Sequence, residues 1–140
     1  MNYFNNAWGF SDSEKKEADE VKLPCFLNIS ACQLRTKDFD QVITNCSKAL
    51  DIDTRSVKAL FRRGQAYSRM NEYDKAKSDF AEALQYEPNN KDIRNEYEHL
   101  KKKVAAYNQE KKKMFGGMFD KMNKKEEEKK TEEKKEETTQ

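Results

Sequence analysis

The sequence predicts an all-α protein, built from a repeated helix–turn–helix unit and closed by a long C-terminal helix. Two observations support this fold class. Residues 23–56 align without a gap on residues 57–90, a shift of 34 residues. Residues 91–119 then carry apolar side chains at alternating spacings of four and three, which is typical of one face of an amphipathic helix.

The second copy, residues 57–90, has small and aromatic residues where the two helices of a hairpin would cross. They are Leu60, Gly64, Tyr67, Ala76, Phe80 and Ala83. Pro88 follows, and it ends the unit because proline cannot continue a helix. The period and this pattern are those of the tetratricopeptide repeat (TPR), whose helix hairpins stack into a superhelix.

The first copy, residues 23–56, keeps most of the pattern with two different packing residues. Ser30 stands where Gly64 does, and Cys46 stands where Phe80 does. Phe39-Asp40 and Tyr73-Asp74 are predicted to mark the same short turn and the start of the second helix in each copy.

Upstream of the repeats, Ser11 and Glu14 fit a capping box, so a helix is predicted to begin near Asp12. Pro24 leaves two alternatives. It either kinks one long helix or lies in the first turn of the repeat's opening helix, where its missing N–H costs nothing. We interpret residues 1–22 as the remnant of an incomplete first TPR unit and a connecting helix.

After the repeats, residues 91–119 are predicted to form an amphipathic capping helix. Its apolar stripe comprises Ile93, Tyr97, Leu100, Val104 and Tyr107. The pair Gly116-Gly117 is expected to end this helix. Residues 120–140 are rich in Lys and Glu and lack an apolar face, so we expect a disordered or transiently helical tail.

Composition excludes several functional classes. Of the 140 residues, 39% are charged and 35% hydrophobic, and the net charge is only +2, so no global field favours nucleic acid or membrane. No stretch approaches the roughly 18 apolar residues that span a bilayer, and no secretory signal is visible. We expect a soluble protein of the cytoplasm, with the nucleus as a second compartment.

No catalytic, metal or cofactor site is predicted. The three cysteines, Cys25, Cys32 and Cys46, lack metal-ligand spacing and are expected to be small core residues. His99 is the one histidine, and no partner is placed to orient it as a general base.

The candidate binding residues lie on the first helices of the two repeats, which line the concave surface of a TPR array. Lys58 and Arg62 are four residues apart and share a helix face. Asn28 occupies the repeat position of Arg62 one unit earlier. These three side chains would suit carboxylates, since Arg binds them bidentately, Lys supplies a point charge and Asn donates neutrally. The alternative is that Lys58 and Arg62 belong to an ordinary solvated face.

Four segments resemble the C-terminal TPR domain of the large immunophilins, peptidyl-prolyl isomerases of the FKBP and cyclophilin types. The segments are residues 27–32 (LNISAC), 58–64 (KALFRRG), 88–90 (PNN) and 112–121 (KKMFGGMFDK). The last one is most similar to FKBP-type members from protists. The resemblance covers roughly residues 1–121 and excludes the isomerase domain, so it implies a binding module without catalysis of its own.

The resemblance implies a partner and a site. In this family a dicarboxylate clamp holds the C-terminal aspartate of the Met-Glu-Glu-Val-Asp tail of the ninety-kilodalton heat-shock chaperone. By position, Asn28 would be the middle-repeat asparagine of the clamp, and Lys58 and Arg62 its last-repeat cations. The family also uses a lysine and an asparagine from the first helix of the first repeat, which this sequence is expected to lack.

Two further hypotheses stay open. Residues 100–119 would form a basic amphipathic ligand for calmodulin of the kind described for immunophilin tails, with Leu100, Val104, Tyr107 and Phe115 as anchors. The alternative for this segment is a capping helix whose lysines are simply solvated. The other hypothesis is a fragment of a peptidyl-prolyl isomerase whose catalytic domain lies outside the sequence.

Overall fold

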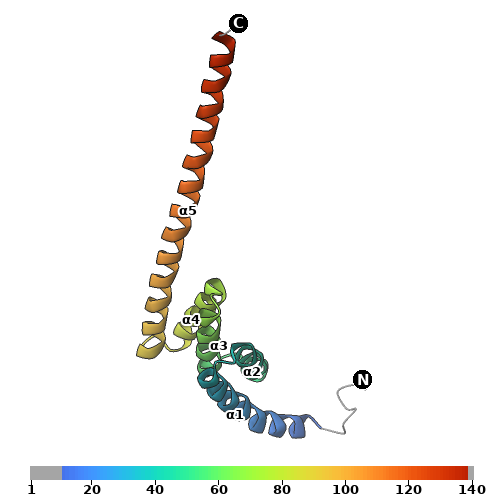
Figure 1. The fold of residues 1–140 in the computed structure, drawn as a ribbon. Coiled ribbons are helices and arrows are strands. Elements are labelled where there is room, and N and C mark those ends of the chain that lie inside the picture. The colour runs from blue at the N-terminus through green and yellow to red at the C-terminus, as the bar shows by residue number, and fades with distance from the viewer. Residues whose placement is uncertain (1–10, 139–140) are drawn as a thin grey trace. The chain divides into compact units, whose positions relative to one another are not determined.

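The computed structural model describes residues 11–138, and within that range the chain forms five α-helices and no strand (Figure 1). They are α1 (Asp12–Thr36), α2 (Phe39–Ile52), α3 (Val57–Arg69), α4 (Tyr73–Tyr86) and α5 (Lys91–Thr138). The predicted all-α class is confirmed. The expected remnant of a first TPR unit falls partly on residues 1–10, which lie outside the described residues.

The helices begin and end where local side chains favour it. Ser11 accepts the backbone N–H of Glu14, and Glu14 in turn accepts the N–H of Ser11, so the predicted capping box is present. Ser56 caps α3 in a similar way by accepting the N–H of Ala59. Such caps satisfy backbone donors that a helix N-terminus otherwise leaves without partners.

The turn inside each hairpin is the same. Lys37 and Asn71, 34 positions apart, each have a φ of 63°. This left-handed conformation reverses the chain, and α2 and α4 begin at the expected Phe39 and Tyr73. The sequence repeat therefore corresponds to a repeated backbone conformation at the turn of each hairpin.

The boundary between two compact units falls after Leu100. In the first unit α1 packs on α2, α2 on α3 and α3 on α4, and α1 also touches α3. Its core is made of fully buried small and apolar side chains. They are Val42, Cys46, Ala49, Ala59, Leu60, Ala66, Ala76, Phe80, Ala83, Ile93 and Leu100.

In both hairpins the two helices cross closely, and the side chains that meet at the crossing differ in size between the two hairpins. A Cβ atom on Gly64 would lie 2.6 Å from Cε1 of Phe80, so only glycine fits beside that ring. In the first hairpin Ser30 and Cys46 occupy these positions, and both are fully buried. Burial raises the pKa of the Cys46 thiol, which is consistent with a packing role.

The structure decides one open alternative and corrects two sequence expectations. Pro24 lies inside the continuous helix α1 and not in the first turn of a separate helix. Helix α5 does not end at Gly116-Gly117 and continues to Thr138, because Lys and Glu are good helix formers and can pair four residues apart. Cys25 and Cys32 are exposed, since they lie on a face of α1 that no described residue covers.

No helix within residues 11–138 combines the length and apolar content needed to cross a membrane.

Candidate functional site

Arg62 joins the two hairpins. Its Nη1 donates a hydrogen bond of 2.6 Å to the main-chain oxygen of Leu27, which also accepts the Ser30 hydroxyl at 2.7 Å. The half-buried guanidinium is therefore held against α1, directly beside the backbone of Asn28. The fold thus brings Arg62 and Asn28 together from different repeats.

Lys58 and Asn28 are exposed. Lys58 lies one helical turn before Arg62 on α3, so the two cations share one face of that helix. Asn28 lies on α1, next to the carbonyl that Arg62 binds. All three predicted residues are accessible to a ligand at least in part, and they come from the two expected helices.

The neighbouring Arg63 has a different environment from Arg62. Its Nε and Nη2 donate to the two carboxylate oxygens of Asp79 on α4, at 2.8 and 2.7 Å, and its Nη1 donates to Ser47 on α2 at 3.3 Å. The hydrogen bond to Asp79 raises the pKa of Arg63 above its ordinary value. Arg63 therefore has a structural role, whereas no carboxylate within the described residues forms a salt bridge with Arg62.

Two adjoining pockets lie between α3 and α5 in the first unit. The smaller, of about 170 Å³, is lined by Lys58 and Glu87 among others, and the larger is about 300 Å³. Phe61 and Asp92 line both. The pockets therefore form one groove, and Lys58 is among the residues that line it.

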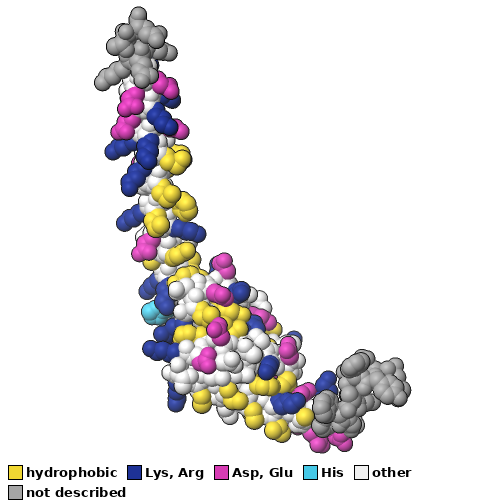
Figure 2. Space-filling model, turned by 45° about the vertical axis from the view of Figure 1, so that its right-hand side comes forward, with side chains coloured by type: hydrophobic (Ala, Val, Ile, Leu, Met, Phe, Trp, Pro, Cys, Tyr) yellow, Lys and Arg dark blue, Asp and Glu magenta, His cyan; other side chains and the backbone are white. Residues whose placement is uncertain are grey.

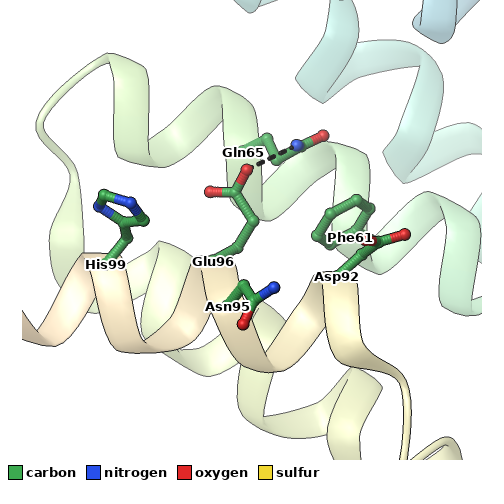
Figure 3. Close-up of a pocket in the computed structure, with 6 residues that line it drawn as sticks. All are labelled: Phe61, Gln65, Asp92, Asn95, Glu96 and His99. Carbon is green, nitrogen blue, oxygen red and sulfur yellow. Dashed lines mark hydrogen bonds between the residues drawn. The ribbon is translucent and has the colours of Figure 1, made fainter.

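The larger pocket mixes aromatic, amide and acidic groups (Figure 3). Its lining residues are Phe61, Gln65, Asp92, Asn95, Glu96 and His99. The Gln65 side-chain amide donates to Glu96 across the pocket at 3.1 Å. Of these residues only His99 stands out in the sequence, although positions 58, 61 and 65 recur at helical spacing on one face of α3.

His99 is exposed in this pocket, and no group of three or more potential metal ligands occurs among the described residues. The other residues that line the pocket carry an aromatic ring, amides and carboxylates, and none is a serine, threonine or cysteine. The pocket offers hydrogen bonds and negative charge.

The second unit begins at Lys101 and consists of the rest of α5. Along it, large apolar side chains are exposed beside lysines (Figure 2). They are Tyr107, Met114, Phe115, Met118, Phe119 and Met122. Val104 is half-buried, whereas Leu100, expected to be an anchor of the same ligand face, is only 1% exposed and belongs to the core of the first unit. Leu100 is therefore not free to bind a partner.

Comparison with known proteins places the chain among TPR domains. The family model described as "Tetratricopeptide repeat" matches residues 57–90. Bovine "Peptidyl-prolyl cis-trans isomerase FKBP4" is 42% identical over 82 residues, which are 59% of this chain and 18% of that protein. The chain thus spans about a fifth of this relative, and the match lies in its TPR region and not in its isomerase domain.

Solved structures agree with this placement. The C-terminal TPR-containing domain of a Plasmodium falciparum FK506-binding protein superposes with a TM-score of 0.69 at 30% identity, covering 77% of this chain and 72% of that one. The Saccharomyces cerevisiae Hsp90 co-chaperone Cns1 gives 0.69 at 30% identity, covering 76% of this chain and 35% of that one. The first TPR of Spaghetti (RPAP3), solved bound to the HSP90 peptide SRMEEVD, gives 0.59 at 27% identity, covering 66% and 76%.

Proposed function

Because this chain belongs to the family of TPR domains found at the C-termini of FKBP-type immunophilins, we propose that it binds the acidic C-terminal peptide of an Hsp90-type chaperone. As a TPR region it is a protein-interaction module of the kind found in Hsp90 co-chaperones, and it is not an isomerase by itself.

The observation that carries the proposal is the position of Arg62. Its guanidinium uses one N–H on the Leu27 carbonyl and is held between the two hairpins, one turn from Lys58. A guanidinium has five N–H donors, so donors remain for a carboxylate. Lys58 adds a second positive charge and Asn28 a neutral donor, and together they match the two carboxylates of a C-terminal aspartate.

Replacing Arg62 by alanine is expected to weaken binding of a Met-Glu-Glu-Val-Asp peptide at least about tenfold, the cost of one charge-assisted hydrogen bond. Lys58→Ala is expected to act in the same direction with a smaller effect, because an exposed point charge contributes less. Isothermal titration on the purified chain measures both.

Arg94→Ala is the matched control for Arg62→Ala. Arg94 is an exposed arginine on the side of α5 that faces away from the pocket, so the same charge is removed elsewhere. Urea unfolding of Arg62→Ala would separate lost binding from lost contact with α1. Equal affinity of Arg62→Ala and the native chain would rule out this residue as a carboxylate ligand.

We propose calmodulin binding by α5 as a second function. The supporting observation is that Tyr107 and Phe115 are 49% and 62% exposed, with Met114, Met118 and Met122 exposed near them. Lysines 111–113 lie among these residues, and a basic helix with exposed Met and aromatic anchors suits a groove of acidic rim and apolar floor.

A peptide of residues 101–125 is expected to shift calmodulin in a native gel with calcium and not with a chelator. The double variant Phe115→Ser, Met118→Ser is expected to abolish the shift. The control is Lys129→Ala, which lies outside the apolar region and is tested in a longer peptide that includes this residue. A shift that persists in chelator would point to charge alone and contradict an apolar anchor.

A further inference from the structure

The larger pocket between α3 and α5 has a charge opposite to that of the proposed carboxylate site. Lys58, Glu87 and Asp92 are among the residues that line the smaller pocket. Asp92 and Glu96 are among those that line the larger one (Figure 3). Phe61 and Asp92 line both pockets, so Lys58 and these carboxylates border one continuous depression. A ligand that lies along it would therefore meet carboxylates as well as Lys58.

The two carboxylates lack a cation. Asp92 and Glu96 are four residues apart on α5, a spacing at which like charges repel each other. Within residues 11–134 no salt bridge joins either carboxylate to a Lys or Arg side chain. The contact made by Glu96 across the pocket is the neutral amide of Gln65 at 3.1 Å. A positive charge placed there would relieve the repulsion.

The Phe61 ring forms one wall of the pocket, on which the cation and the aliphatic part of a basic side chain can pack. Its ring is held by the buried ring of Phe80, with centroids 6.0 Å apart, and the side chain remains half-buried. A fixed aromatic ring attracts Lys or Arg through its π face, and the methylene stem of either residue can pack on the same ring.

We propose that this pocket binds a lysine or arginine side chain of the same peptide whose C-terminal carboxylates lie at Lys58 and Arg62. The inference rests on the proposed function and specifies its ligand: a peptide with an acidic end preceded by a basic residue. Asp92 and Glu96 pair with the cation, Phe61 packs against its stem, and Asn95 and Gln65 are placed to hydrogen-bond the peptide.

The spacing of the basic residue follows from helix geometry. Gln65 lies seven residues beyond Lys58 on α3, which corresponds to about 10.5 Å along the axis. An extended peptide advances about 3.3 Å per residue, so its main chain covers this length in about three residues. Allowing for the long side chain, the basic residue stands about three to five positions before the C-terminus.

The experiment is a peptide series titrated against the full chain at low salt. Each peptide ends in Ala-Val-Asp and carries a single arginine three, four or five positions before the C-terminal aspartate, with alanine at the other two of these positions. The matched peptide has glutamine in place of the arginine. One arginine position is expected to bind about three- to fivefold tighter than its glutamine counterpart.

This preference is expected to disappear in the double variant Asp92→Asn, Glu96→Gln and to persist in Glu98→Gln, which removes a carboxylate from the opposite side of α5. Circular dichroism checks that the variants keep their helices. The inference is overturned if arginine gives no advantage in the native chain, or if its advantage survives in the double variant.

Amidated versions of the same peptides distinguish a failure of the basic subsite from a failure of the carboxylate site. If amidation weakens every peptide while arginine makes no difference, the carboxylate site stands and the basic subsite fails. If amidation has no effect on any peptide, the carboxylate site itself fails.

Discussion

Replacing Asp79 by alanine is expected to destabilise the protein by about 3–5 kcal/mol, the usual cost of removing one partner of a buried ion pair. The Asp79 side chain is 5% exposed and accepts two hydrogen bonds from Arg63, at 2.7 and 2.8 Å. The Arg63 side chain is 22% exposed, and without Asp79 its partly buried guanidinium has no anion to balance its charge. Urea unfolding followed by circular dichroism measures the loss.

Asp51→Ala provides the comparison, because Asp51 is an exposed aspartate on α2 and its removal should change stability by no more than about 0.5 kcal/mol. The joint replacement Arg63→Met, Asp79→Leu should recover most of the lost stability, since apolar residues of similar volume can replace a buried pair. A small effect of Asp79→Ala would mean that water solvates Arg63 and that the pair is not structural.

Phe80→Ala is also expected to cost about 3–5 kcal/mol, because it removes the largest fully buried side chain of the first unit and leaves a cavity. The same ring forbids a side chain at Gly64, since a Cβ atom there would lie 2.6 Å from Cε1 of Phe80. Gly64→Ala alone is therefore expected to destabilise the protein, by about 1–3 kcal/mol for overpacking.

The effect of Gly64→Ala on stability is expected to change sign in the Phe80→Ala variant. With Phe80 replaced by alanine, the obstacle to a Cβ at position 64 is gone, and alanine is then favoured over glycine in a helix by up to about 1 kcal/mol. Gly64→Ala should thus stabilise the Phe80→Ala variant. Urea unfolding of the four proteins of this cycle tests it, and an equal penalty for Gly64→Ala in both backgrounds would contradict the packing account.

Local features of the fold could be predicted from the sequence where a residue type has one strong physical preference. The capping box at Ser11 and the starts of α2 and α4 followed from turn and cap chemistry. The small-against-large packing of Gly64 and Phe80 followed from the repeat alignment. In each case the deciding interaction is formed within one hairpin.

Other features depend on contacts that composition does not specify. Gly116-Gly117 was a reasonable helix end, but with nothing within 4 Å of either Cβ position the glycines only weaken the helix, and the neighbouring Lys and Glu continue it. Cys25 and Cys32 were expected in the core, and their exposure is decided by which face of α1 has neighbours.

The residues of the candidate site likewise depend on contacts that the sequence alone does not specify. Arg62 and Arg63 are adjacent and chemically identical, and the sequence favours the first as the ligand only through its spacing from Lys58 and the family resemblance. The structure gives a physical basis for the difference, since Arg63 is directed at the buried Asp79 whereas Arg62 reaches the Leu27 carbonyl on α1. The pair Asp92 and Glu96 could not be recognised from the sequence, because both are ordinary residues of a charged helix until α3 is placed beside them.

The most direct test of the central claim compares two forms of one peptide. The native chain is titrated with SRMEEVD as the free acid and as the C-terminal amide, which differ by a single negative charge at the terminus. The account predicts that the amide binds at least about tenfold more weakly, and that Arg62→Ala weakens the free acid far more than the amide. Equal affinity for the two forms would contradict a carboxylate-binding TPR groove.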